Sequence, residues 1–204
     1  MKKALLIIDV QNDFLPGGSL AVPNGNDIIP LINDIQSCFD LIIATQDWHP
    51  LQHKSFAVNN PGTEVFERIT LNGLEQVLWP THCVQGTYGA EFASELLLNK
   101  VSAVIRKGTN PETDSYSGFF DNGKQYSTGL SGLLKELLIQ EVYVCGLAAD
   151  YCVYYTAKDA VENGFSTFFI EDASKPISED NYQAIKQELT AKNVIFMKSS
   201  DLKK

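Results

Sequence analysis

The sequence predicts an α/β protein of three layers, with a mainly parallel six-stranded sheet between two layers of helices. Two observations predict this fold. Six short runs are largely apolar and rich in β-branched and aromatic residues, as strands buried on both faces are. Segments with helical spacing lie between them, and this alternation is typical of a parallel sheet covered by helices. The runs span 4–9, 40–47, 101–107, 141–146, 166–172 and 194–197.

Four helices are expected between these strands, and the last two of them have end signals. In chain order, the third is expected to begin near Asp150, which would lie near its cap, and to end at the Asn-Gly pair at 163–164, a common helix stop. A fourth is expected over 178–192, with acidic residues in its first turn, where the helix dipole favours them. The first two are predicted from apolar faces, formed by Ile28, Ile32, Ile35 and Phe39 and by Leu130, Leu133, Leu134, Leu137 and Leu138.

The composition predicts a single globular domain over 1–204. Hydrophobic residues make up 44% and charged residues 20%, and the formal net charge is −9. An acidic chain without a basic cluster argues against nucleic acid or an anionic membrane as the main partner. No apolar run is long enough to span a membrane, and the N-terminal run is too short for a signal peptide. The four cysteines form no C-x-x-C pair, which favours reduced thiols and a cytoplasmic protein.

One region, about 48–100, breaks the alternation of strands and helices. It is rich in proline and glycine and has little sustained periodicity. An irregular connection of this length inside one domain is usually functional. We therefore expect it to carry part of a site.

Chemically active side chains follow four of the predicted strands. Asp9 ends the first, Asp47 the second and Lys107 the third, and Cys152 comes shortly after the fourth. Ligands of open parallel sheets bind beyond the carboxyl ends of the strands. The sequence therefore predicts that a carboxylate, a group of metal-ligand types, an amine and a thiol meet at one edge.

The second strand leads into a candidate metal site. Asp47 and His49 are two residues apart, so both face one side of an extended segment, and His53 follows within reach. The remaining histidine, His82, lies in the irregular region, so all three histidines of the chain would be ligands. Imidazole and carboxylate suit Zn²⁺ and related ions. Cys83 is a competing soft ligand, ranked below His82 because adjacent residues rarely face one ion.

Cys152 is the candidate nucleophile. It opens a helix, whose dipole would lower the thiol pKa and whose free amides can hold an oxyanion. With the histidines engaged by metal, Asp9 is the candidate base and Lys107 its partner. An exposed lysine at a strand end is an equally good explanation of Lys107. Cys38 and Cys145 lie in apolar runs and are expected to be inert.

Five blocks of the chain, in order, resemble the nicotinamidases among the isochorismatase-like cysteine hydrolases. The resemblance spans nearly the whole chain. The second block, which holds the candidate metal ligands Asp47, His49 and His53, distinguishes this chain from family members that lack a metal site. The blocks are LLIIDVQNDFLPGGSL (5–20), ATQDWHPLQHKSF (44–56), WPTHCVQGTYGAEF (79–92), RKGTNPETDSYSGFFDNG (106–123) and VCGLAADYCVYYTAKDAVENG (144–164).

The resemblance implies the isochorismatase-like hydrolase fold and a metal-dependent amidohydrolase that converts nicotinamide to nicotinate and ammonia, a step of NAD salvage. It implies an Asp-Lys-Cys triad, one divalent ion (Zn²⁺, with Mn²⁺ or Fe²⁺ as alternatives), and a cis peptide before Ala148. The implied residues are the triad Asp9, Lys107 and Cys152; the ligands Asp47, His49, His53 and His82; the oxyanion amides of Ala148 and Cys152; and the pocket residues Phe14, Trp79, Tyr116 and Leu147.

Three alternatives remain at this point. Another carboxamide or carbamoyl hydrolase of the superfamily would keep the triad but need the metal block less. A vinyl ether hydrolase of the isochorismatase type typically lacks the cysteine, so Cys152 argues against it. A non-enzymatic metal- or partner-binding domain would have no use for a complete triad. Apolar surface around 144–151 and on the later helices makes a homo-oligomer one expected state, and activity on pyrazinamide is left open.

Overall fold

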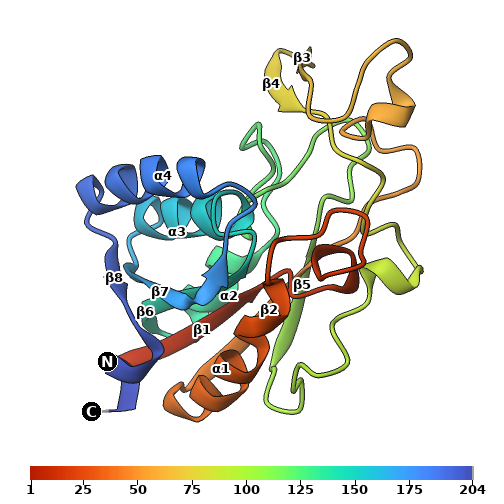
Figure 1. Ribbon diagram of the computed structural model, residues 1–204. Helices are drawn as coiled ribbons and strands as arrows, with labels where there is room; N and C mark the ends of the chain where they lie inside the picture. The colour runs from red at the N-terminus through yellow and green to blue at the C-terminus, as the bar shows by residue number, and fades with distance from the viewer. Residues whose placement is uncertain (204) are drawn as a thin grey trace.

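The computed structural model describes residues 1–203, and within that range six parallel strands form one sheet (Figure 1). Their spatial order is β5-β2-β1-β6-β7-β8, and every neighbouring pair is parallel. The predicted fold class is confirmed. The strands are β1 (Lys2–Ile8), β2 (Leu41–Asp47), β5 (Ala103–Lys107), β6 (Ile139–Leu147), β7 (Ser166–Lys175) and β8 (Ile195–Met197).

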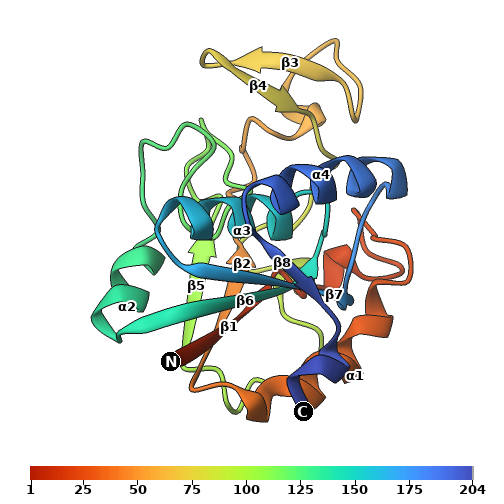
Figure 2. The ribbon, with the colours of Figure 1, turned by 90° about the vertical axis from the view of Figure 1, so that its left-hand side faces the viewer.

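Helices cover both faces of the sheet (Figures 1 and 2). On one face α1 (Ile28–Ile35) packs against β6 and β7; on the other lie α2 (Leu130–Glu136) and α3 (Cys152–Glu162), with α4 (Glu179–Ala191) packed on α3. Alternate residues of β1 enter two separate buried clusters: Leu5 and Ile7 one, Leu6 and Ile8 the other. This period-two alternation explains why the strand is apolar at every position from Ala4 to Ile8.

Two helices end earlier than their apolar faces predicted. The first stops at Ile35 and continues as a 3₁₀ turn, Gln36–Cys38, so Phe39 lies beyond it in extended backbone. The second stops at Glu136, and Leu138, with φ of 59°, is 70% exposed. In both cases the apolar spacing continues past the point where the backbone leaves the helix towards the next strand.

The third helix begins at Cys152, and Asp150 does not cap it. The Asp150 carboxylate instead accepts hydrogen bonds from the amides of Ile177 (2.8 Å) and Ser178 (3.0 Å), at the start of α4. Asp150 therefore lies near the cap of α3 as expected, directly before the N-cap residue Tyr151, but its oxygens bond to two distant amides and not to α3. The fourth helix agrees with prediction, and the Ser178 side chain accepts from the Asn181 amide at its N-terminus.

The irregular region contains a hairpin that the sequence reasoning missed. Strands β3 (Arg68–Leu71) and β4 (Leu74–Val77) pair antiparallel, and the hairpin stands clear of the three layers (Figure 2). The turn is Asn72-Gly73, with φ of 52° and 82°, and an Asn-Gly pair between short strands is a strong hairpin signal. Across the described residues, no helix has the length and apolar character needed to cross a membrane.

Candidate active site and metal centre

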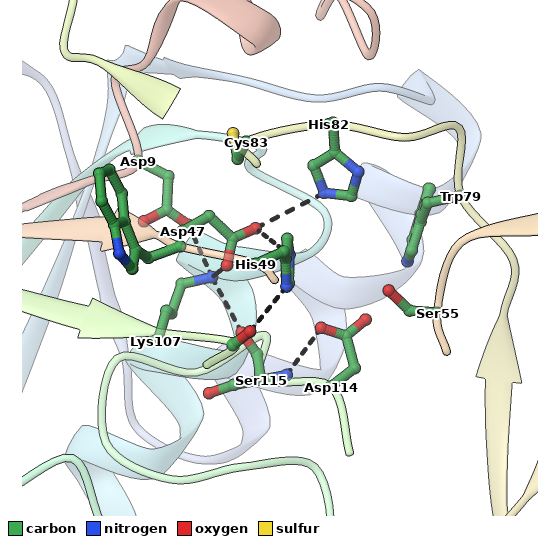
Figure 3. A network of polar contacts seen from close by, with 12 residues as sticks. Asp9, Asp47, His49, Ser55, Trp79, His82, Cys83, Lys107, Asp114 and Ser115 are labelled. Carbon is green, nitrogen blue, oxygen red and sulfur yellow. Dashed lines mark hydrogen bonds and ion pairs between the residues drawn. The ribbon is translucent and has the colours of Figure 1, made fainter. Parts of the chain in front are cut away.

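Lys107 lies at the centre of the polar groups that the strand ends bring together (Figure 3). Its Nζ is 2.9 Å from Asp9 Oδ2, 2.9 Å from Asp47 Oδ1 and 3.4 Å from Cys152 Sγ. It also donates to the Ser115 carbonyl at 2.9 Å. The side chain is fully buried, so the alternative of an exposed strand-end lysine is wrong. A buried ammonium among two carboxylates and a thiol keeps its charge.

Backbone conformation brings these groups within reach of one another. Asp9 directly follows β1 and has φ of 47°, in the left-handed backbone region that residues other than glycine rarely adopt. Gly146, near the end of β6, lies so close to β1 that a Cβ there would sit 2.1 Å from the Ile8 carbonyl oxygen. Strained backbone of this kind clusters at functional sites. The peptide between Leu147 and Ala148 is cis, as the resemblance implied.

The electrostatics place the resting proton on sulfur. Burial raises the pKa of the Cys152 thiol well above its usual value; Lys107 opposes this, and Asp9 adds to it. Burial also raises the pKa of Asp9, against the Lys107 charge. The expectation that the helix dipole lowers the thiol pKa is therefore not met, because loss of solvent outweighs the favourable charges. Lys107 has its pKa raised well above its usual value, with burial opposing the two carboxylates.

The two Asp9 oxygens have different partners. Oδ1 accepts a 2.6 Å hydrogen bond from the Thr45 hydroxyl. Oδ2 forms an ion pair with Lys107 at 2.9 Å but accepts no hydrogen bond within the described residues, so it is the oxygen better placed to receive a proton. Thr45 was missed by the sequence reasoning, since a threonine inside a buried strand carries no signal of its own.

Two amides beside Cys152 are available to an oxyanion. The amides of Ala149, Tyr151 and Val153 donate to backbone carbonyls. Within residues 1–203, those of Ala148 and Cys152 have no backbone acceptor. This is the pair that the resemblance implied, and preorganised amides of this kind stabilise developing negative charge.

Three of the four predicted metal ligands form one cluster. The Nε2 atoms of His49 and His82 lie 3.1 Å and 3.6 Å from Asp47 Oδ2, and the three side chains are buried (Figure 3). Each ring nitrogen on the far side is engaged: His49 Nδ1 donates to the Gly108 carbonyl at 2.9 Å and His82 Nδ1 to the Pro80 carbonyl at 2.8 Å. Such bonds fix the tautomer and aim Nε2 at a metal.

Gly108 makes the His49 position possible. A Cβ on it would lie 2.4 Å from the His49 ring, and its φ of 66° suits glycine. The Asp47 carboxylate raises the His49 pKa against burial, while His49 and Lys107 hold the pKa of Asp47 well below its usual value. The donor set of two imidazoles and an ionised carboxylate fits a divalent transition-metal ion, which would take the place of the proton on His49.

His53 lies in a neighbouring cluster with His49 and Asp114. Its Nδ1 accepts from the Ser55 amide and lies 2.7 Å from the Ser55 hydroxyl. Its Nε2 is buried and has no partner within the described part of the chain. Burial lowers the His53 pKa to about 4, so the ring is neutral at pH 7. A buried nitrogen without a partner is costly, which indicates that a group absent from the protein itself belongs beside it.

The predicted pocket residues gather over Cys152, with one exception. Phe14, Trp79 and Tyr116 line a cavity that includes His82 and Cys152, whereas Leu147 packs in the core and is not among its lining residues. The cavity encloses about 20 Å³, room for roughly one water molecule. Cys83 is not part of the candidate metal cluster, and its sulfur lies 3.9 Å from the Gly89 carbonyl oxygen. Lining residues that sequence reasoning missed are Leu20, Asp114, Tyr151 and Ile177.

Comparison with known proteins agrees with this geometry. A model of the isochorismatase domain matches residues 3–201. This chain belongs to the isochorismatase family. Within the family, it is similar to a nicotinamidase of Acinetobacter baylyi, with 46% identity over 200 residues that cover 98% of this chain and 94% of the relative. The resemblance to nicotinamidases is thereby confirmed.

Solved structures of the family are also similar. A nicotinamidase and pyrazinamidase from Acinetobacter baumanii superimposes with a TM-score of 0.97 at 47% identity and covers 98% of each chain. A pyrazinamidase of Pyrococcus horikoshii, solved in complex with zinc, has a TM-score of 0.80 at 35% identity and covers 97% of this chain and 99% of its own.

Proposed function

We propose that this protein hydrolyses nicotinamide to nicotinate and ammonia, with a divalent metal ion and a thioester on Cys152. One observation carries the proposal: Cys152, which contacts Lys107, and Asp47 and His82 of the candidate metal cluster line the same small pocket. A carboxamide carbon over the sulfur would leave the attached ring between the aromatic walls. The relatives named nicotinamidase support this choice of substrate.

The chain's own groups can move the protons of both half-reactions. Asp9 accepts the thiol proton of Cys152, and the thiolate attacks the amide carbon. The amides of Ala148 and Cys152 hold the oxyanion, and Asp9 then gives its proton to the departing nitrogen as the C–N bond breaks. Asp9, ionised again, takes a proton from the water that attacks the thioester carbon, and gives that proton to the sulfur as the C–S bond breaks. Lys107 stabilises the thiolate and the ionised Asp9 throughout.

The metal would be held by Asp47, His49 and His82, with His53 as the fourth ligand predicted from the sequence. Zn²⁺ is our choice, supported by the zinc complex of the similar pyrazinamidase. When bound, such an ion supplies a Lewis acid that a pyridine nitrogen can coordinate. This role favours a ring carboxamide over the carbamoyl substrates of other superfamily members.

Ammonia release tests the proposal. Purified, metal-loaded protein is given nicotinamide, in parallel with a Cys152→Ala variant and a chelated sample. We expect release by the native protein, loss of it in the variant, and recovery of the chelated sample when metal is added back. If the metal-loaded native protein released no ammonia, the proposed function would be wrong. If Cys152→Ala kept full activity, only the proposed mechanism would be wrong.

A further inference from the structure

The hairpin β3–β4 places one side chain inside the protein. Among its strand residues, all of them described, only Gln76 is buried, with 3% of its surface exposed. The remaining strand residues are exposed or half-buried, and the hairpin stands outside the layers of the fold (Figure 2). A projecting hairpin that buries one polar residue contributes little to the core, so the contacts of that residue define what the hairpin does.

Gln76 reaches two residues of the candidate site. Its Nε2 is within hydrogen-bond distance of the Val77 carbonyl (2.7 Å), Asp114 Oδ2 (3.0 Å) and the Tyr116 hydroxyl oxygen (3.2 Å), so its two hydrogens are shared among three acceptors. Asp114 belongs to the cluster with the two histidines of the metal block, and Tyr116 lines the pocket. The amide nitrogen of Gln76, not its oxygen, faces Asp114 Oδ2.

A chain of hydrogen bonds runs from the hairpin into the pocket wall. The Tyr116 oxygen accepts from Gln76 and also from Trp79 Nε1, at 3.2 Å each. Two donors occupy both lone pairs of the phenol oxygen, so the rings of Tyr116 and Trp79 are fixed relative to each other. The second oxygen of Asp114 has Gln76 as its donor, while Oδ1 accepts from the Ser115 amide.

We propose that Gln76 is a positioning residue for the substrate ring: it holds the Trp79–Tyr116 wall and orients Asp114 towards the histidine cluster. The inference rests on the proposed function. The cavity holds about one water molecule, so a pyridine ring must separate its walls on binding. Where the walls rest, and how far they move, depends on the contacts behind them. Gln76 touches none of Asp9, Lys107 and Cys152, so its influence falls on binding rather than on bond cleavage.

The test is a Gln76→Leu variant compared with Thr70→Ala, an exposed residue of the same hairpin. In Gln76→Leu we expect the KM for nicotinamide and the Kd for nicotinate, measured by calorimetry, to rise about tenfold, as loss of a hydrogen bond to a charged group predicts. We expect kcat to stay within about twofold. Gln76→Glu, of equal size, places a second carboxylate beside Asp114 and should raise KM further. Thr70→Ala should change none of these values.

A second readout is independent of turnover. The chain has two tryptophans, so its ¹⁵N spectrum has two indole N–H signals, which Trp48→Phe assigns. Loss of Gln76 should shift the Trp79 signal, because its acceptor Tyr116 loses its second donor, while Trp48 stays in place. In a Tyr116→Phe background the effect of Gln76→Leu on nicotinate binding should shrink, since the two share one contact.

Three results would each overturn the proposal. The first is a KM and a nicotinate affinity within twofold of native in both Gln76 variants, and the second is a fall in kcat at unchanged KM. The third is a Trp79 signal that does not move. If native protein did not release ammonia but the Trp79 signal shifted, the positioning role would stand and the proposed reaction would fail. If Gln76→Leu did not fold, the KM, the nicotinate affinity and the Trp79 signal of Gln76→Glu would test the proposal instead.

Discussion

The two halves of the site are built on different kinds of structure. The half that would break the amide bond lies at strand ends: Asp9 after β1, Lys107 at the end of β5 and Cys152 after β6. The half that would hold the metal and the ring is supplied largely by irregular segments, with His82, Trp79 and Asp114 outside any helix or strand. The rigid sheet fixes the reacting groups, while the loops determine which molecule reaches them.

The strongest test of the first half removes the nucleophile. Cys152→Ala should lower kcat for nicotinamide by about 10⁴-fold or more, because no other thiol lies beside Lys107 and Asp9 in the described structure. Nicotinate affinity, measured by calorimetry, should change by less than about threefold, since the walls and metal cluster remain. If the variant kept a tenth of native activity, the group of Asp9, Lys107 and Cys152 would not be the one that breaks the amide bond.

Lys107 should be as important to stability as to catalysis. Lys107→Met leaves the buried carboxylates of Asp9 and Asp47 without their shared cation, which should cost about 3–5 kcal/mol in the free energy of unfolding. The matched control is Lys124→Met, which removes a half-exposed lysine paired with Asp159 and Glu162 and should cost less than about 1 kcal/mol. Denaturant unfolding measures both, and equal losses would contradict a special role for the buried cation.

The same contrast explains how much could be predicted from the sequence. The strands and the proposed triad could be predicted from apolar runs, four of which lead into a reactive residue, because the carboxyl ends of parallel strands share one edge. The proposed metal ligands were identifiable because histidine is rare here. Gln76, Asp114 and Ile177 were not identifiable, since their roles come from long-range contacts that leave no local pattern. The hairpin had a local signal, Asn72-Gly73, and could have been found.

His49 and His53 are expected to differ in how much each contributes to metal binding. His49→Ala removes a member of the Asp47 cluster and should abolish stoichiometric zinc, measured by elemental analysis after dialysis. His53→Ala should weaken zinc binding less, because Asp47, His49 and His82 remain together in one cluster when His53 is lost. Equal loss of zinc in both variants would contradict this difference between the two histidines.

The smallest effect concerns the protonation of Asp9. The Thr45 hydroxyl donates to Asp9 at 2.6 Å and favours the ionised carboxylate, so Thr45→Val should raise the Asp9 pKa further above its usual value. Only ionised Asp9 can accept the Cys152 proton. The acidic limb of kcat/KM should therefore move to higher pH, by about one unit or less, with a several-fold loss near that limb and little loss above it. Thr167→Val, buried elsewhere and bonded to the Phe165 carbonyl, is the control. A limb that stayed in place, or moved equally in the control, would remove Asp9 as the group that limits activity in acid.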